Sequence, residues 1–273
     1  MSHPQQLARR STAFALTILS AACAPSAGTV TTRTPPGPPP ITDGRGVLRA
    51  MHDRYAGKWF NTLTFSQRTT TYSASGRETK GVWNEYLAAP GRLRIDYLPL
   101  NERSGVLYAR NRVHSFVNGK ASASQDGWNP LLILIADVYV QPVDTSLWQM
   151  DSLGFQTSIV RRDVLHGAPT WVVGAVAGDT TSSQFWIDAE SLLVRRVIQK
   201  QKGGTRTTIS DVRLAKYTDV GGYPVAFDVT FYRDGRLYFK EEYFDAKANV
   251  VLSPDIFDPA KWVASQPRPA PVK

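Results

Sequence analysis

The spacing of apolar residues along the chain is helical up to residue 59 and strand-like from residue 63 onward. The first apolar residues recur close to every 3.6 positions, and Thr42 or Asp43 stands where a helix N-cap is expected. The sequence therefore predicts an N-terminal helix whose buried face consists of Val47, Leu48, Met51, Tyr55 and Trp59.

Beyond this helix, apolar and polar residues alternate over most of the chain, which is typical of strands with one buried face. Residues 92–97 are the clearest case, with Leu93, Ile95 and Tyr97 on one side and Arg92 and Arg94 on the other. We interpret the basic side of such strands as a solvated convex face of a sheet. A weaker alternative is that it attracts anionic lipid headgroups.

Turn signals separate the predicted strands into consecutive hairpins, as at Asn118-Gly119, Gly203-Gly204 and Asp234-Gly235. Ten or more strands connected in this way imply a strongly curved antiparallel sheet or a barrel. A first predicted strand begins with Leu63 and Phe65, and further strands are predicted at 82–87, 92–97, 104–109, 112–117, 155–162, 169–177, 183–188, 192–201, 205–217, 223–233 and 236–245.

One segment breaks the alternation. Asn129 and Pro130 are a cap residue and a first-turn proline, and residues 131–135 are apolar on every side. Three interpretations remain open: a helix that plugs the concave face of the sheet, a mobile lid over a lipid-sized cavity, or a buried strand. A second short helix is predicted at 145–153, where Leu147, Trp148 and Met150 are apolar.

The N-terminal residues have the pattern of an export signal. Arg9 and Arg10 precede an uncharged apolar stretch that ends in small residues, so we expect residues 1–22 to be a signal peptide. Ala21-Ala22-Cys23 resembles the end of a bacterial lipoprotein box, which predicts acylation of Cys23, the only cysteine. The alternative is cleavage near Ala22, with Cys23 incidental.

A proline-rich spacer follows this cysteine. Residues 24–40 contain six prolines and no aromatic residue, a composition typical of an extended, semi-rigid tether. We therefore divide the chain into a signal peptide at 1–22, an acylatable cysteine and tether at 23–41, a folded domain at 42–263 and a disordered tail at 264–273. The folded part would face the periplasm from a membrane anchor.

Composition and charge narrow the possible functions. The 273 residues are 42% hydrophobic and carry a formal net charge of +9, which could favour nucleic acid or anionic lipid. Because the export signal directs the protein out of the cytoplasm, we do not expect nucleic acid to be a partner. The mature histidines, His52, His114 and His166, lack partners at metal-ligand spacing, and we find no nucleophile or phosphate-binding motif. The sequence predicts a protein without enzymatic activity, metal or cofactor.

Several motifs, in order along about 200 residues, resemble the LolA/LolB superfamily of bacterial envelope carriers and receptors for lipoproteins. They are Leu63-Thr64-Phe65-Ser66-Gln67, Ala89-Pro90-Gly91 with the strand to Tyr97, the segment 129–136, Phe185-Trp186-Ile187-Asp188 with its following strand, and Phe257-Asp258-Pro259. The resemblance implies a mainly β fold: a single curved antiparallel sheet forming an open (half) β-barrel, with an N-terminal helix and one or two inserted helices covering its concave face. The family's carriers use an arginine just before the proline equivalent to Pro90 to lock a lid. In this chain Ala89 occupies that position.

The resemblance implies a hydrophobic cavity that takes lipid or the acyl chains of lipoproteins, in transport or sorting within the envelope. The alternative is a structural or sensory subunit of an envelope membrane complex, with a barrel filled by side chains. The expected lipidation site is Cys23, and the expected cavity residues are Leu63, Phe65, Leu93, Ile95, Tyr97, Leu131, Leu132, Leu134, Ile135, Trp148, Phe227, Val229 and Phe231.

Overall fold

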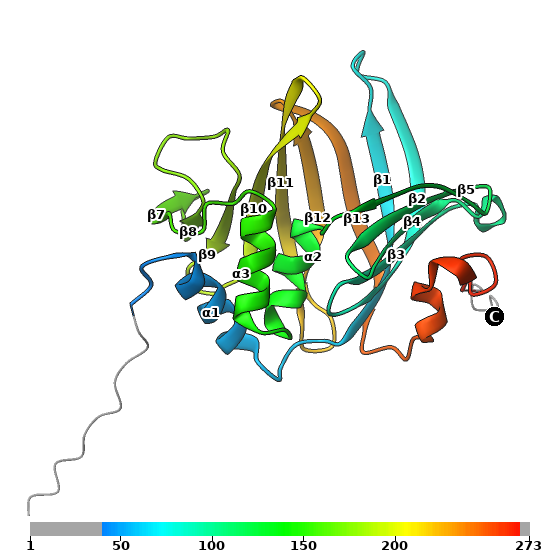
Figure 1. Cartoon of the computed structure of the whole chain (residues 1–273), viewed down its shortest axis with the longest axis horizontal. Coiled ribbons are helices and arrows are strands. Elements are labelled where there is room, and N and C mark those ends of the chain that lie inside the picture. Colours follow the sequence, from blue (N-terminus) through cyan, green and yellow to red (C-terminus); the bar gives the residue numbers. More distant parts are fainter. Residues whose placement is uncertain (1–39, 268–273) are drawn as a thin grey trace, which may run out of the picture. The chain divides into compact units, whose positions relative to one another are not determined.

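A computed structural model describes residues 40–267 of the chain. The signal peptide, Cys23, nearly all of the tether and the last residues of the tail lie outside this range, so their predicted roles remain predictions. Within the described range, the chain forms one sheet with helices packed on it (Figure 1).

All thirteen strands belong to one antiparallel sheet. They are β1 (Thr62–Tyr72), β2 (Glu78–Ala88), β3 (Arg92–Tyr97), β4 (Gly105–Ala109), β5 (Arg112–Val117), β6 (Lys120–Asp126), β7 (Val160–Leu165), β8 (Ala168–Val173), β9 (Gln184–Asp188), β10 (Val194–Gly203), β11 (Arg206–Asp219), β12 (Pro224–Arg233) and β13 (Arg236–Ala248).

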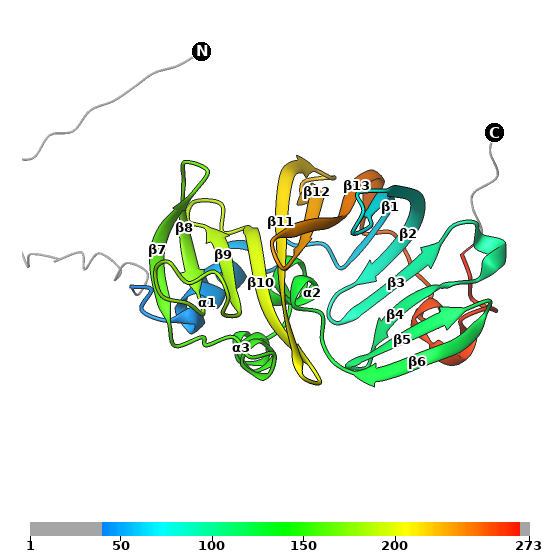
Figure 2. The same ribbon diagram turned by 90° about the horizontal axis from the view of Figure 1, so that it is seen from above.

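The strand order explains why the sheet stays open. Strands adjacent in sequence are paired throughout, except that β6 and β7 form the two outer edges and β1 pairs with β13 near the middle. Figure 2 shows the two halves of the sheet curving around the helices. The predicted fold class, an open curved antiparallel sheet with helices, is confirmed.

The N-terminal helix α1 (Gly44–Tyr55) begins where the sequence predicts it. The Asp43 carboxylate accepts a hydrogen bond from the Gly46 amide at 2.8 Å, and Val47, Leu48 and Met51 are fully buried. Trp59, expected on the same helical face, instead lies beyond the end of the helix. It is nonetheless buried beside the cavity.

The chain segment between the two outer edges crosses the concave face of the sheet. It contains α2 (Pro130–Ile135), a 3-10 helix (Asp137–Tyr139) and α3 (Val143–Ser152). Asn129 caps α2 by accepting a hydrogen bond from the Leu131 amide at 2.9 Å, with Pro130 in the first turn. This segment has to leave β6 and reach β7, so its apolar helices lie over the sheet. The strand interpretation of residues 129–139 is wrong.

The observed strands differ from the predicted ones in several places. Residues 155–159 form turns rather than the start of a strand, since Gly154 has a positive φ of 84° and redirects the chain. Strand β6, which the sequence did not predict, is polar and exposed along its whole length, so it has no buried alternation to detect. Its Lys, Ser and Asp side chains suit an edge strand, since they discourage pairing with another chain.

The C-terminal segment covers the convex side of β3–β5. A second apolar cluster joins Leu107 and Phe116 to Ile256, Phe257 and Trp262. Two 3-10 helices, Pro254–Phe257 and Pro259–Lys261, build this cover, which is red in Figures 1 and 2. Residues 264–267, placed by sequence in the tail, continue it: the Gln266 amide donates to the Leu100 carbonyl at 2.9 Å.

This cover corrects the interpretation of Arg94. The side chain lies on the convex face as predicted, but it is 0% exposed rather than solvated. Its guanidinium forms an ion pair with Asp96, also fully buried, and stacks over the Trp262 ring at 4.0 Å. The sequence pattern could not reveal this burial, because the covering residues come from more than 150 positions further along the chain.

Candidate functional site

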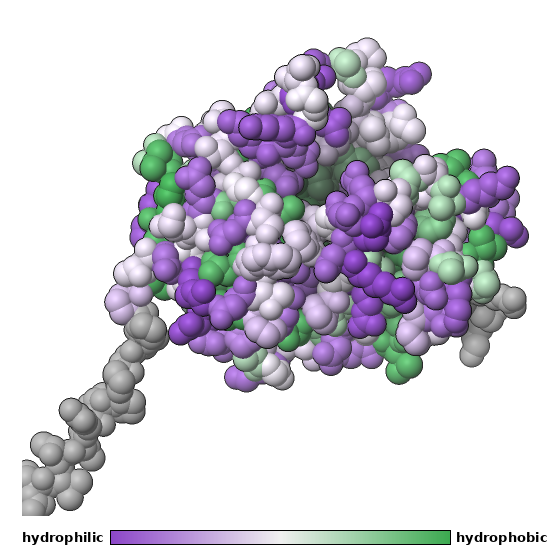
Figure 3. Space-filling view, viewed as in Figure 1, coloured by the Kyte–Doolittle hydropathy of each residue, from purple (hydrophilic) through white to green (hydrophobic). Residues whose placement is uncertain are grey.

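The concave face of the sheet and the helix α2 enclose a cavity with two adjoining lobes. The space between protein atoms is about 470 Å³ in the inner lobe and about 890 Å³ in the outer lobe, and both values include space that is open to solvent. Figure 3 shows a hollow with a hydrophobic interior on this side of the molecule, bordered by hydrophilic residues. Sites for small molecules are typically such concave, mostly apolar spaces.

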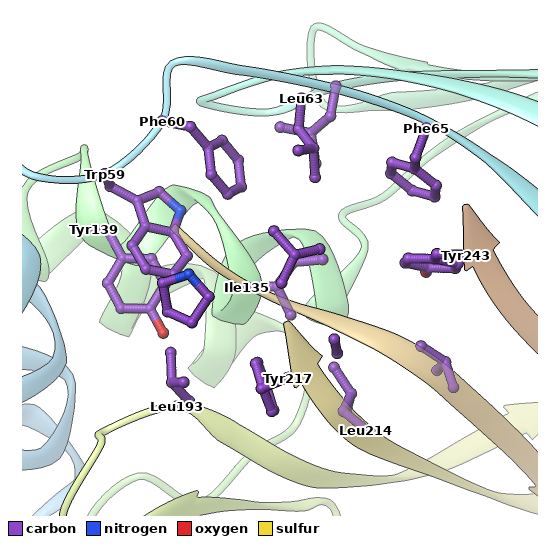
Figure 4. Close-up of a pocket in the computed structure, with 15 residues that line it drawn as sticks. Trp59, Phe60, Leu63, Phe65, Ile135, Tyr139, Leu193, Leu214, Tyr217 and Tyr243 are labelled. Atoms are coloured by element: carbon purple, nitrogen blue, oxygen red, sulfur yellow. The ribbon is translucent and has the colours of Figure 1, made fainter. Parts of the chain in front are cut away.

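The same four side chains line both lobes and form the boundary between them. They are Phe65 from β1, Leu87 from β2, Tyr243 from β13 and Ile135 from α2. The Phe65 and Tyr243 rings stack across neighbouring strands with centroids 4.2 Å apart. A chain-shaped molecule that occupies both lobes would therefore pass between Ile135 and this aromatic pair (Figure 4).

The inner lobe is narrow and almost entirely apolar. Its far end is built by Trp59, Tyr139 and Tyr217, seen on the left and bottom of Figure 4. The two tyrosine hydroxyls donate to the backbone carbonyls of Leu192 and Val194, so their polar ends are satisfied within the protein. The wall offers apolar ring surface and few polar atoms, which suits a hydrocarbon chain.

The outer lobe has an aromatic wall. The Trp83 ring lies 4.5 Å from that of Tyr97 and 5.2 Å from that of Phe239, and Phe239 lies 5.4 Å from Phe231. These four residues belong to β2, β3, β12 and β13, whose inward positions converge here. The wall thus combines residues from both halves of the sheet.

Two carboxyl groups interrupt this aromatic wall, and one buried amide lies beside them on β1. Glu85 is 5% exposed and Glu241 is 8% exposed, and both line the outer lobe. Gln67, fully buried, stands between them on β1: it pairs with Trp83 of β2 and Tyr243 of β13, while Glu85 and Glu241 are the diagonal neighbours. Cross-strand partners share a face of the sheet, so all three polar side chains point to the concave side.

Hydrogen bonds satisfy only part of this cluster. The Tyr243 hydroxyl donates to Glu241 Oε2 at 2.9 Å. Both amide atoms of Gln67 are buried and lack a hydrogen-bond partner within residues 40–267, whereas the carboxyl oxygens of Glu85 are not among the fully buried unpaired atoms. Gln67 lies near enough to lower the pKa of Glu241, yet its amide does not reach hydrogen-bonding geometry. Buried polar groups are usually satisfied, so this cluster requires an explanation.

Burial and mutual repulsion favour the protonated forms of the two acids. Burial raises the pKa of Glu85 well above its ordinary value, and the nearby Glu241 carboxylate raises it further. Burial also raises the pKa of Glu241 to about 7, against the opposing effect of the Tyr243 hydroxyl. Neither lobe has a lysine, arginine or histidine in its wall. Strongly perturbed acids in a cleft are candidates for a functional site.

The covering segment is attached to the sheet at the turn after β2. Asp137, 1% exposed, accepts a hydrogen bond from the Gly91 amide at 2.9 Å. Burial raises the pKa of Asp137 to about 7, and the hydrogen bond from Gly91 opposes this rise. Ala89 precedes this turn, and the hydrogen bond from Gly91 to Asp137 fastens the covering segment there.

Ten of the thirteen expected cavity residues line one of the two lobes. Leu134, Trp148 and Phe227 do not. Leu134 is fully buried against the core, Phe227 packs beside Tyr243, and Trp148 is 58% exposed and contacts Trp128 on the outer surface of the helices. Whether the ten bind a ligand remains a prediction.

The sequence analysis did not identify Gln67, Glu85 and Glu241, although a signal was present. Each occupies an inward position of an otherwise apolar alternation: Gln67 follows Leu63 and Phe65, and Glu85 stands between Trp83 and Leu87. A polar residue at a core position of a strand is a local inconsistency that often marks function. Their convergence could not be predicted, because it depends on the long-range pairing of β1 with β13.

Other chemistry is sparse within residues 40–267. His114 lies on an edge-proximal strand beside Ser124, and burial lowers its pKa. No group of three or more His, Cys, Asp or Glu side chains in this range is arranged to hold a metal ion. A search of the helices in the described part of the chain finds none with the length and apolar character of a membrane span.

Comparisons with known proteins identify the fold. No protein-family model and no curated protein sequence matches the chain. Among solved structures, a LolA superfamily protein from Nitrosomonas europaea is 12% identical, with a TM-score of 0.50, covering 77% of this chain and 97% of its own. A DUF1329 family protein from Desulfovibrio piger is 11% identical, with a TM-score of 0.54, covering 82% and 98%.

A third solved structure is a domain described as an outer membrane lipoprotein-sorting protein, from Vibrio parahaemolyticus. It is 10% identical to this chain, with a TM-score of 0.54, and the match covers 80% of this chain and 97% of that one. The resemblance to the LolA superfamily is therefore confirmed at the level of the fold. At these identities the likeness concerns architecture alone, and any function has to be argued from the cavity.

Proposed function

We propose that this protein binds the hydrocarbon chains of lipids or of acylated proteins in its two-lobed cavity, as a carrier or sorting component of the bacterial envelope. The observation that carries the proposal is the apolar space that side chains leave unfilled between the sheet and α2. The LolA-like fold supports it, since one structural neighbour is described as a lipoprotein-sorting protein.

Elementary energetics favour a hydrocarbon ligand. Each methylene group removed from water contributes about 0.8 kcal/mol. An inner lobe lined by Phe60, Leu63, Val225 and Val229 can shield many such groups. The polar atoms of its tyrosines are already bonded to the backbone, so a chain that enters displaces no protein hydrogen bond there.

The proposed location is the periplasmic side of the envelope, with Cys23 acylated and residues 24–40 as a spacer. Several buried acyl chains on one cysteine would hold the protein on a membrane. In this arrangement the partners are a lipid or an acylated protein, and an envelope protein complex is a further possible partner. Nothing in the cavity is arranged for catalysis that we can identify, so the proposed activity is binding.

The second candidate function is a structural or sensory subunit of an envelope complex that uses the same fold. It predicts a concave face filled by side chains, in which voids larger than a water molecule are few. The two lobes and the unpaired Gln67 amide favour the binding function over this alternative.

Native mass spectrometry of the purified protein tests the proposal. We expect the wild type to carry co-purified lipid, and we expect Val229→Phe, which fills the inner lobe, to carry much less. Val164→Phe is the matched control, because Val164 is exposed on β7 and lines neither lobe. Wild-type protein free of lipid, together with failure to bind a fluorescent fatty acid, would favour the structural-subunit function.

A further inference from the structure

We propose that the preferred ligand of this cavity is an amphiphile whose polar end is a positively charged amine, held by Glu85 and Glu241 in the outer lobe. This inference rests on the proposed function, because it takes the apolar lobe as the site of the hydrocarbon chain. It adds the chemistry of the group that anchors the other end.

The charges that line the cavity are all of one sign. Two carboxyl groups line the outer lobe, and no basic side chain does. The nearest basic residues on the same strands, Arg68 and Lys240, alternate to the convex face, where they contact Phe244 and Glu242. A buried carboxylate needs a positive or hydrogen-bonding partner, so the missing cation is expected to come from a ligand.

The polar side chains at the outer lobe have hydrogen-bonding groups that the protein itself leaves unused. Gln67, 0% exposed, leaves both its carbonyl and its amine unpaired within residues 40–267. Carboxylate and amide oxygens accept hydrogen bonds, and an ammonium group carries up to three donors and no acceptor. An amine placed between Glu85 and Glu241, which both line the outer lobe, would find an acceptor on each of them.

Aromatic side chains line the outer lobe together with the two glutamates. Trp83, Tyr97, Phe231 and Phe239 are stacked or tilted against one another, with centroid separations of 4.5–5.4 Å, and all four line the lobe. Ring faces attract cations, and aromatic cages are a known way of binding ammonium groups. A fatty-acid carboxylate would meet both negative ring faces and negative side chains, so the same wall disfavours it.

The two lobes together fix the orientation of such a ligand. The carboxyl groups stand in the outer lobe, and the inner lobe beyond Phe65 and Tyr243 is apolar. An amine held at Glu85 and Glu241 would therefore place its hydrocarbon chain past the stacked pair and into the inner lobe. The ligand class is a single-chain or branched amphiphilic amine, rather than a free fatty acid.

Isothermal titration calorimetry with three probes of equal chain length tests the inference. The probes are decylamine, decanol and decanoic acid, each below its aggregation concentration at pH 8. We expect decylamine to bind at least about tenfold more tightly than decanol, as one charge-assisted hydrogen bond would give, and decanoic acid to bind most weakly. Equal affinity for all three, or tighter binding of decanoic acid, overturns the inference and leaves the proposed function standing.

Isosteric variants locate the effect. We expect Glu85→Gln/Glu241→Gln to bind decylamine and decanol about equally, and each single variant to lose part of the preference. Glu242→Gln is the matched control, because Glu242 neighbours Glu241 but lies half exposed on the convex face. A preference that persists in a folded double variant places the amine elsewhere and overturns the inference. Should the double variant not fold, the single variants decide. Absence of binding by all three probes contradicts the proposed function itself.

Discussion

The two faces of the sheet bury polar groups in opposite ways. On the convex side, the Arg94 guanidinium forms five hydrogen bonds, two to Asp96 and the others to Ile256, Trp262 and Ser265. Five is the full donor capacity of an arginine. On the concave side, both amide atoms of Gln67 lack a partner within the described residues.

This difference separates a structural role from a functional one. Removal of a charge from water costs several kcal/mol unless partners compensate. Arg94 and Asp96 are compensated within the protein, so their burial fastens the C-terminal segment to the sheet. The carboxyl groups of the cavity are compensated only in part, by the Tyr243 hydroxyl at Glu241, and a natural fold retains such groups mostly where they serve binding or catalysis. The polar groups on the two faces are similarly buried, so burial by itself does not distinguish the structural role from the functional one.

The largest loss of stability is expected on the convex face, where the protein pairs the buried Arg94 charge completely. Asp96→Ala leaves the Arg94 charge buried without its carboxylate, and we expect the free energy of unfolding to fall by about 3–5 kcal/mol. Urea denaturation measures this change. Asp255→Ala is the control, because it breaks the exposed pair with Lys261 on the same C-terminal segment and should cost less than about 1 kcal/mol. Similar losses in the two variants would mean that Arg94 is not held as described.

The next largest loss of stability is expected at Gly105, where β3 and the C-terminal segment pack closely against β4. A Cβ added at Gly105 would stand 2.0 Å from the Ile95 carbonyl oxygen and 2.9 Å from the Trp262 ring. We expect Gly105→Ala to lower the free energy of unfolding by about 2–3 kcal/mol, since the strands and the C-terminal segment have to separate. Gly127→Ala, where an added Cβ meets nothing, is the control. Thermal denaturation that shows equal stability for both would contradict this packing.

Neutralising a carboxyl group of the cavity should stabilise the protein, whereas the two preceding substitutions destabilise it. The pKa of Glu241 is raised to about 7 from an ordinary value near 4.5, so its contribution to stability is present below pH 4.5 and is lost as the pH rises through 7. We expect Glu241→Gln to increase the free energy of unfolding at pH 8 by about 1–2 kcal/mol and to change it little at pH 4.

Denaturation at a series of pH values checks this prediction. A residual pH dependence is expected in the variant, because burial also raises the pKa of Glu85 and of Asp137. The neighbouring Tyr97, Tyr108 and Tyr243 should not contribute near pH 8, since their pKa values are raised above the ordinary value for tyrosine. A variant less stable than the wild type at pH 8 would show that the ionised carboxylate is compensated after all.

The smallest change in stability is expected at the cavity wall. Ile135 lines both lobes and is only partly buried, so Ile135→Glu can hydrate its carboxylate when the cavity is empty. We expect a loss of about 1 kcal/mol in stability and loss of binding of a neutral hydrocarbon probe, measured by calorimetry. Trp148→Glu, on the exposed side of α3, should bind the probe as the wild type does. Unfolding by Ile135→Glu would indicate a packed plug instead of a cavity wall.

The sequence predicted the parts of this fold that depend on local patterns. Alternation and turn residues identified every strand except the polar β6, and Asn129 with Pro130 marked the start of α2. Most cavity residues followed from the inward positions of those strands. Patterns on single strands cannot predict which outward positions another segment covers, as at Arg94, or which polar residues converge across β13, β1 and β2. Those features depend on tertiary pairing.

The pairing of the first strand with the last has a consequence for how the molecule folds. Strands β1–β6 and β7–β13 can each form hairpin by hairpin from neighbouring residues, whereas the contact of Leu63 with Ala248 closes a loop that spans most of the domain. Such non-local closure is slow compared with local pairing. Glu85 and Glu241 lie on the two strands that flank β1, so they meet only in this step. We expect a chain that lacks β13 to retain most of its hairpins but to have no amine site, and we expect the cavity to be among the last parts of the protein to form.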